Sequence, residues 1–93
     1  MLEKTVKAAV RKRLKQLGAY QCWPVLFGMG ERTVDCIGCY KGRFFAIECK
    51  APGKQPTDIQ LWKLSKIAAA GGAIFVIDTV EKANELTANS FEI

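Results

Sequence analysis

Apolar residues near the start of the chain recur at intervals of three and four positions. These residues are Leu2, Val6, Ala9, Val10, Leu14 and Leu17. The spacing predicts an amphipathic helix that ends at Gly18, because residues three and four apart share one face of a helix. Basic side chains form a second row at the same spacing, and we expect that row to be a solvent-facing cationic ridge. The row consists of Lys4, Lys7, Arg11 and Lys15.

The following segments show the alternation and the turn residues of strands. Residues 19–27 mix aromatic and β-branched side chains with a proline, which indicates an edge or irregular strand before a loop at 28–30. Residues 33–40 and 43–50 alternate in character and are separated by Lys41-Gly42. This arrangement predicts a β-hairpin.

A second helix is predicted from its first turn. Thr57 and Gln60 have the spacing of a capping box, and the helical pattern continues to Gly71-Gly72. Residues 73–78 then form an apolar strand, and residues 80–88 form a short helix. The predicted order of elements is therefore αβββαβα, which belongs to the α/β class.

Composition limits the class of protein. The chain has 93 residues, of which 49% are hydrophobic and 25% are charged, and this favours one soluble globular domain spanning residues 1–93. The longest wholly apolar run, residues 73–77, is far shorter than the roughly 20 residues that span a bilayer. The charged start of the chain does not resemble a signal peptide. We therefore expect a cytoplasmic protein with no membrane partner.

The net charge of +5 is distributed unevenly. Residues 1–18 carry six basic and one acidic side chain, residues 41–66 carry six and two, and residues 67–93 carry one and four. A chain polarised in this way offers basic surface to a polyanion, and nucleic acid is the first candidate. The alternative is that these charges only keep the surface soluble.

The hairpin is predicted to bring two carboxylates together. If its two-residue loop is symmetric, Asp35 lies directly opposite Glu48. Alternation then puts Asp35, Glu48 and Lys50 on one face of the sheet, and it puts Val34 on the other face with Cys36. Opposed carboxylates repel each other, and a divalent cation such as Mg²⁺ would offset this repulsion. Lys50 could orient or activate a metal-bound water, whereas the simpler alternative is an ion pair between Glu48 and Lys50.

At this point the residues form a recognisable pattern. Asp35, one hairpin and then Glu48-Cys49-Lys50 resemble the D…(D/E)-x-K core of the PD-(D/E)XK nucleases. The surrounding sequence is similar, more narrowly, to the VRR-NUC branch of that superfamily. The supporting positions are residues 42–50, Gly53-Lys54, Thr57, Gln60 and residues 70–72. The chain departs from that branch at Val34, where the family usually has a proline before the aspartate.

This resemblance implies a restriction-endonuclease-like αβββαβα core, with a mixed sheet flanked by helices, and a Mg²⁺- or Mn²⁺-dependent endonuclease. The metal ligands that it implies are Asp35, Glu48 and the main-chain carbonyl of Cys49. It assigns Lys50 to support of the attacking water, and it places Gln60 and a helix-one glutamate, Glu3, beside the site. Stand-alone domains of this kind resemble dimeric, structure-selective nucleases, including resolvases of four-way (Holliday) DNA junctions, and they are often carried by phages. A homodimer, branched DNA and the host cytoplasm are the corresponding expectations.

Two of these residues have simpler explanations. Glu3 falls within the apolar arc of the first helix, but so does Arg13, and an acidic residue in a first turn also suits the helix dipole. Gln60 could be only the second half of the capping box that begins at Thr57. For both residues a role in the site and a purely local role stay open.

The four cysteines are expected to be buried and reduced. Cys36 and Cys39 are three positions apart on a predicted strand, so they point to opposite faces, which is poor geometry for chelation. The chain also contains no histidine that could complete a mixed zinc shell. Thiols in a reducing compartment are therefore favoured over a zinc site.

The sequence thus predicts a metal-dependent, structure-selective DNA endonuclease whose catalytic residues are Asp35, Glu48, Lys50 and Gln60. Phosphate contacts are expected from basic residues of both positive segments. They are Lys4, Lys7, Arg11, Lys15, Lys41, Arg43, Lys54 and Lys63. The alternatives are a non-catalytic nucleic-acid-binding module that retains the nuclease fold and a protein-interaction domain. A non-cutting module would bind branched and linear DNA without nicking either.

Overall fold

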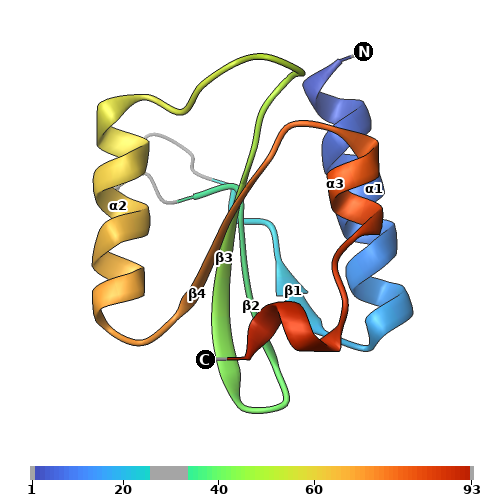
Figure 1. Ribbon diagram of the computed structural model, residues 1–93, viewed down its shortest axis with the longest axis vertical. Coiled ribbons are helices and arrows are strands. Elements are labelled where there is room, and N and C mark those ends of the chain that lie inside the picture. The colour runs from blue at the N-terminus through green and yellow to red at the C-terminus, as the bar shows by residue number, and fades with distance from the viewer. Residues whose placement is uncertain (1, 26–33, 93) are drawn as a thin grey trace.

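The computed structural model describes residues 2–25 and 34–92. The predicted loop at 28–30 and the first residue of the predicted strand at 33 lie outside the described residues. Within them, the predicted order of elements is confirmed (Figure 1). The elements are α1 (Glu3–Leu17), β1 (Tyr20–Cys22), β2 (Cys36–Tyr40), β3 (Arg43–Cys49), α2 (Asp58–Ala69), β4 (Ala73–Ile77), α3 (Val80–Asn84) and a 3₁₀ helix (Ala88–Phe91).

Four strands form one mixed sheet in the order β1-β2-β3-β4. The first three strands pair antiparallel, and β4 pairs parallel to β3. The parallel pair is joined by α2, which covers one face of the sheet, while α1 and α3 cover the other face (Figure 1). The expected mixed sheet flanked by helices is confirmed, and the segment predicted as an edge strand is the three-residue edge strand β1.

The hairpin has the predicted register, since Tyr40 pairs with Arg43. The first hairpin strand is shorter than predicted and begins at Cys36, so Asp35 lies at a bend just before the ladder. The prediction for Val34 was wrong for this reason. Strict alternation holds only within the strand, and Val34 packs against Ala46 on the α2 side of the sheet.

The main core lies between the sheet and the α1/α3 pair. Helix α1 contributes its predicted apolar stripe, of which Val6, Val10 and Leu14 are fully buried. Strand β3 contributes alternate residues, and the ring of Phe45 lies 5.0 Å from that of Phe91 in the 3₁₀ helix. Packing on this side is tight, because a β-carbon at Gly38 would collide with the Tyr20 carbonyl oxygen and the Phe45 ring.

The opposite face of the sheet has a much smaller core. Val34, Ala46 and Leu64 are its buried members, and Ile37 and Ile67 pack partly buried against them. Helix α2 is fixed over this face by the predicted capping box and by the turn at residues 70–72. Because this core is small, the end of the face near the start of α2 remains available to polar side chains.

The end of the chain differs from the single helix predicted at 80–88. Helix α3 stops at Asn84, and a separate 3₁₀ helix follows. The 3₁₀ helix carries Phe91 into the main core, where its ring also contacts Tyr40 and Phe75. No helix in the described residues is both long and apolar enough to cross a membrane.

Candidate active site

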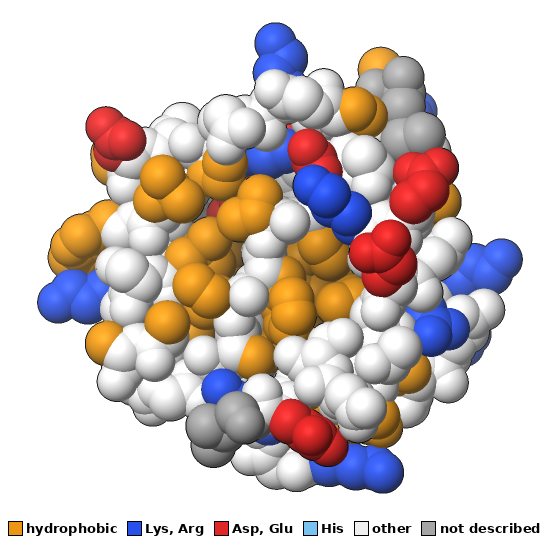
Figure 2. All heavy atoms as spheres, in the orientation of Figure 1, with side chains coloured by type: hydrophobic (Ala, Val, Ile, Leu, Met, Phe, Trp, Pro, Cys, Tyr) orange, Lys and Arg blue, Asp and Glu red, His pale blue; other side chains and the backbone are white. Residues whose placement is uncertain are grey.

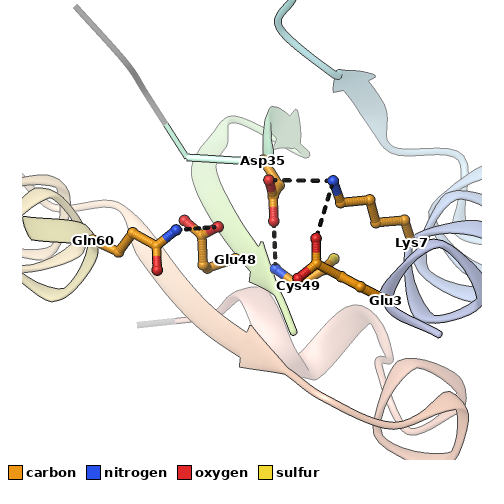
Figure 3. A network of polar contacts seen from close by, with 6 residues as sticks. All are labelled: Glu3, Lys7, Asp35, Glu48, Cys49 and Gln60. Atoms are coloured by element: carbon orange, nitrogen blue, oxygen red, sulfur yellow. Dashed lines mark hydrogen bonds and ion pairs between the residues drawn. The ribbon is translucent and has the colours of Figure 1, made fainter. Parts of the chain in front are cut away.

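The two predicted carboxylates meet at the end of the sheet opposite the hairpin turn (Figure 3). Asp35 lies at the bend before β2, and Glu48 is the penultimate residue of β3. Both line a cavity of about 660 Å³ that Gln60 of α2 and Glu3 of α1 also reach. Strands and helices that are distant in the sequence therefore converge on one acidic site.

Asp35 is held by two different elements. Its Oδ2 accepts a hydrogen bond of 2.8 Å from the backbone N–H of Cys49, and its Oδ1 lies 3.6 Å from the Nζ atom of Lys7. The bend before β2 turns the side chain along the end of β3. The carboxylate is thereby fixed beside the last residues of that strand.

Glu48 is almost completely buried, with 2% of its surface exposed. Its Oε1 accepts a hydrogen bond of 3.3 Å from the Gln60 side chain, and its Oε2 receives no hydrogen bond from the described residues. Burial raises the pKa of Glu48 to about 8, and Asp35 adds to this through a side-chain hydrogen bond and charge repulsion. Lys50 opposes the increase. Burial beside Asp35 therefore favours the protonated form of Glu48 when no cation is bound.

Gln60 contacts both the helix cap and Glu48. Its side-chain oxygen accepts a hydrogen bond of 2.9 Å from the N–H of Thr57, and its own backbone N–H is capped by the Thr57 hydroxyl at 3.2 Å. The other half of the same side-chain amide donates to Glu48. The helix cap and the site are thus coupled through one side chain.

Glu3 and Lys7 enter the site from α1 (Figure 3). Glu3 lines the cavity, and its Oε2 lies 3.4 Å from the Nζ atom of Lys7. The placement of Lys7 on a solvent-facing ridge was wrong, because its ammonium lies between Glu3 and Asp35. The spacing contained the missing signal. Residues four apart lie on the same side of a helix, so Lys7 must face the site if Glu3 does.

Oxygen atoms make up the potential ligand set. The described residues contain no group of three or more Asp, Glu or Cys side chains arranged to hold a metal ion. Two carboxylates that meet at a buried edge suit a hard divalent cation, which takes one or two carboxylates together with water and substrate oxygens. The buried Oε2 of Glu48 accepts no hydrogen bond from the described residues and faces Asp35, so a cation that displaces the proton between the two carboxyl groups would fit the residues present.

The predicted phosphate-binding residues do not share one surface. Lys4, Lys15 and Lys54 are exposed, and Lys63 lines the site cavity. Lys41 and Arg43 lie instead at the hairpin turn, and Arg43 is about 17 Å along β3 from Glu48 at the usual rise per residue.

Two arginines expected to contact DNA make structural contacts. The guanidinium of Arg43 donates to the carbonyl oxygens of Gly71, at 2.9 Å, and Phe91, at 3.0 Å. The guanidinium of Arg11 lies over the ring of Trp23, 4.9 Å from the ring centroid. Arg43 thus joins two main-chain segments at the hairpin end of the sheet, and its role as a phosphate ligand stays a prediction.

All four cysteines are free thiols. Cys36 and Cys49 are buried, as expected, and burial raises the pKa of each thiol to about 12. Cys22 is half-buried and Cys39 is exposed, so burial was predicted correctly for two of the four. Thiols with such a high pKa are protonated at neutral pH and are poor metal ligands.

Comparison with solved structures identifies the fold. The chain matches a structure described as a VRR_NUC domain with a TM-score of 0.74, and the match covers 90% of this chain and 91% of that one at 20% sequence identity. The chain therefore has the fold of a VRR_NUC domain. The resemblance predicted from the sequence is confirmed at the level of the fold.

Sequence comparison adds a phage protein. The chain is 36% identical over 47 residues to "Putative nuclease p44" of Acyrthosiphon pisum secondary endosymbiont phage 1. This match covers 50% of the chain and 50% of the relative, so the chain spans about half the length of the curated protein that it matches. No family model matches the chain.

Proposed function

We propose that this protein is a metal-dependent, structure-selective DNA endonuclease that hydrolyses phosphodiester bonds, with the four-way junction as its candidate substrate. The observation that carries the proposal is the meeting of Asp35 with buried Glu48, whose Oε2 receives no hydrogen bond. Buried acidic groups are costly unless a partner or a function compensates for them. The VRR_NUC fold and the phage relative named as a nuclease support the same reaction class.

Mg²⁺ or Mn²⁺ is the proposed cofactor. Its ligands would be Asp35, Glu48 and the main-chain carbonyl of Cys49, while Glu3 lines the same cavity from α1 and would have to move toward the ion to contribute. When bound, such an ion supplies Lewis-acid activation of water and neutralises charge on the phosphate. The protein provides the fixed carboxylates, of which Asp35 is oriented by the Cys49 N–H.

The remaining residues of the site position groups and hold protons. Lys50 lines the cavity next to Glu48, where its ammonium would orient the attacking water and contact the scissile phosphate. Gln60 fixes the orientation of Glu48 through its amide. Lys63 lines the cavity and Lys54 lies in the loop before α2, and both would contact flanking phosphates. Such contacts position the DNA without reading its base sequence.

A homodimer in the host cytoplasm is part of the proposal. Strand β4 is an open edge of the sheet, and Ile74 and Val76 on it are 38% and 39% exposed. Figure 2 shows hydrophobic side chains gathered on this face of the molecule, between the flanking helices. Exposed apolar surface beside an open strand edge is suited to association with a second copy. Two sites related by a two-fold axis would match the two strands of a symmetric junction.

The test is a cleavage assay on four-way junctions, flaps, nicked duplexes and plain duplexes at matched salt, with Mg²⁺, Mn²⁺ or EDTA. The wild-type protein should cut a branched substrate only with metal. Glu48→Ala should reduce cleavage by on the order of a thousandfold, since it removes a metal ligand. Glu81→Ala is the control, because Glu81 is an exposed carboxylate on α3, away from the cavity.

Two outcomes would contradict the proposal. Binding of branched and linear DNA without nicks, in any metal, would favour the non-catalytic module. Cleavage that survives Glu48→Ala would place the catalytic centre elsewhere.

A further inference from the structure

Lys7 is a cation already held inside the acidic site. Its Nζ lies 3.6 Å from Asp35 Oδ1 and 3.4 Å from Glu3 Oε2, and its side chain is 37% exposed. Figure 3 shows the side chain extending from α1 toward Asp35, between that residue and Glu3. The two acidic groups nearest the mouth of the site therefore share one ammonium group.

The contacted atoms are those that a metal ion would need. The Cys49 N–H takes one acceptor position on Oδ2 of Asp35, whereas Oδ1 lies 3.6 Å from the Lys7 ammonium. Glu3, the other carboxylate that reaches the cavity from α1, contacts the same ammonium. A monovalent cation supplied by the chain thus lies on both accessible carboxylates.

The ammonium keeps its charge in this environment. Desolvation lowers the pKa of Lys7, but attraction to Asp35 and Glu3 outweighs it, so the pKa is raised above its ordinary value of 10.5. A lysine ammonium is positive at neutral pH, since its ordinary pKa lies far above neutrality, and the two ion pairs hold that charge against Glu3 and Asp35. A positive charge beside two ligands repels an incoming divalent cation, by about 1 kcal/mol per pair of unit charges at 4 Å even in water.

We propose that Lys7 is an internal counter-ion that competes with the divalent metal for Asp35 and Glu3 and withdraws when the metal binds. The inference rests on the proposed function, because it concerns the same carboxylates. Lys7 neutralises the acidic cluster in the metal-free protein and thereby sets a lower limit on the metal concentration at which the site fills. Its long side chain allows it to leave Asp35 for the cavity mouth, where a phosphate of the substrate can replace the carboxylate as its partner.

The experiment measures metal binding to the protein without DNA. Isothermal titration calorimetry with MgCl₂ and with MnCl₂ is carried out on the wild type, Lys7→Met and Lys12→Met after removal of metal with EDTA. Lys12 is the matched control, because it is an exposed lysine of the same helix and does not line the cavity. Lys7→Met keeps an unbranched side chain only one atom shorter and removes its charge, so it should bind either metal about tenfold more tightly. Lys12→Met should match the wild type.

Unchanged or weaker metal affinity in Lys7→Met would overturn the competition. Weaker affinity would show that Lys7 organises the ligands instead. Absence of metal binding to the wild type would contradict the proposed function itself. The wild-type titration therefore distinguishes a failure of the proposed function from a failure of the proposed competition by Lys7. If Lys7→Met does not fold, NMR of the ¹⁵N-labelled wild type replaces it. The ammonium signal of Lys7 is assigned as the lysine signal that is missing in Lys7→Arg. The Lys7 signal should shift on saturation with Mg²⁺, and a stationary signal would contradict the proposal.

Discussion

The two faces of β3 differ in how completely they are filled. Toward α1 and α3, Phe45, Ile47 and Cys49 are fully buried in a twelve-residue cluster of buried side chains. Toward α2, Ala46 belongs to a cluster of only three buried residues, and Glu48 follows it at the edge of a cavity of about 660 Å³. One strand therefore anchors the fold with one face and presents acidic chemistry with the other. The dense face supplies the rigidity that the site requires.

The largest expected effect is a loss of stability when a large buried side chain is removed from either face of β3. Phe45→Ala should destabilise the protein by about 4 kcal/mol, because Phe45 is fully buried and contacts the Phe91 ring. Leu64→Ala should cost about 2 kcal/mol, since Leu64 belongs to the smaller core near the cavity, where the structure can relax. Urea unfolding followed by circular dichroism measures both values. Equal losses would show that the α2 face is packed as firmly as the other.

The next effect concerns the acid on the open face. The pKa of Glu48 is raised from 4.5 to about 8 by burial and by Asp35. Between these pH values the folded chain retains a proton that the unfolded chain has lost, so stability should fall as the pH rises from about 4.5 to 8. Glu48→Gln should remove much of this fall and stabilise the protein at pH 8 by up to about 4 kcal/mol.

Unfolding free energies at pH 5, 6.5 and 8 test this expectation, with Glu81→Gln as the exposed control. The other groups whose pKa values are shifted titrate outside the range from about pH 4.5 to 8. The pKa of Asp78 is lowered from 3.8, while that of Lys7 is raised from 10.5 and those of Cys36 and Cys49 from 9.0. A pH dependence that persists unchanged in Glu48→Gln would show that groups other than Glu48 cause it and would contradict the raised pKa of Glu48.

The smallest effect tests the link between helix cap and site. Thr57→Ala removes the hydroxyl that caps Gln60 N–H and should cost about 1 kcal/mol of stability. Gln60→Glu preserves an acceptor for the Thr57 N–H and removes the donor to Glu48, so it should lower cleavage by roughly tenfold with little loss of stability. Melting temperature and cleavage rate are measured for both variants. Full activity in Gln60→Glu would show that Gln60 serves only to cap helix α2.

Patterns within single elements were predictable from the sequence. The i, i+3 and i, i+4 stripe that ends at Gly18 gave α1, and Thr57 with Gln60 gave the start of α2. The hairpin register followed from its two-residue turn, and the register brought Asp35 toward Glu48. The failures were at positions where a strand ends or where a helix borders another layer. Val34 and Lys7 are examples, since their surroundings come from distant segments.

The amino-acid sequence by itself determined the order of the elements, the register of the hairpin and the acidic residues at its open end. These features depend on backbone geometry and short-range periodicity, which act over a few residues. Only the tertiary structure decided that Glu48 is buried beside Gln60, that Asp35 bonds to the Cys49 N–H and that Lys7 lies on the acids. Desolvation and charge pairing depend on which layers meet, and α1, β3 and α2 meet only when the chain has folded.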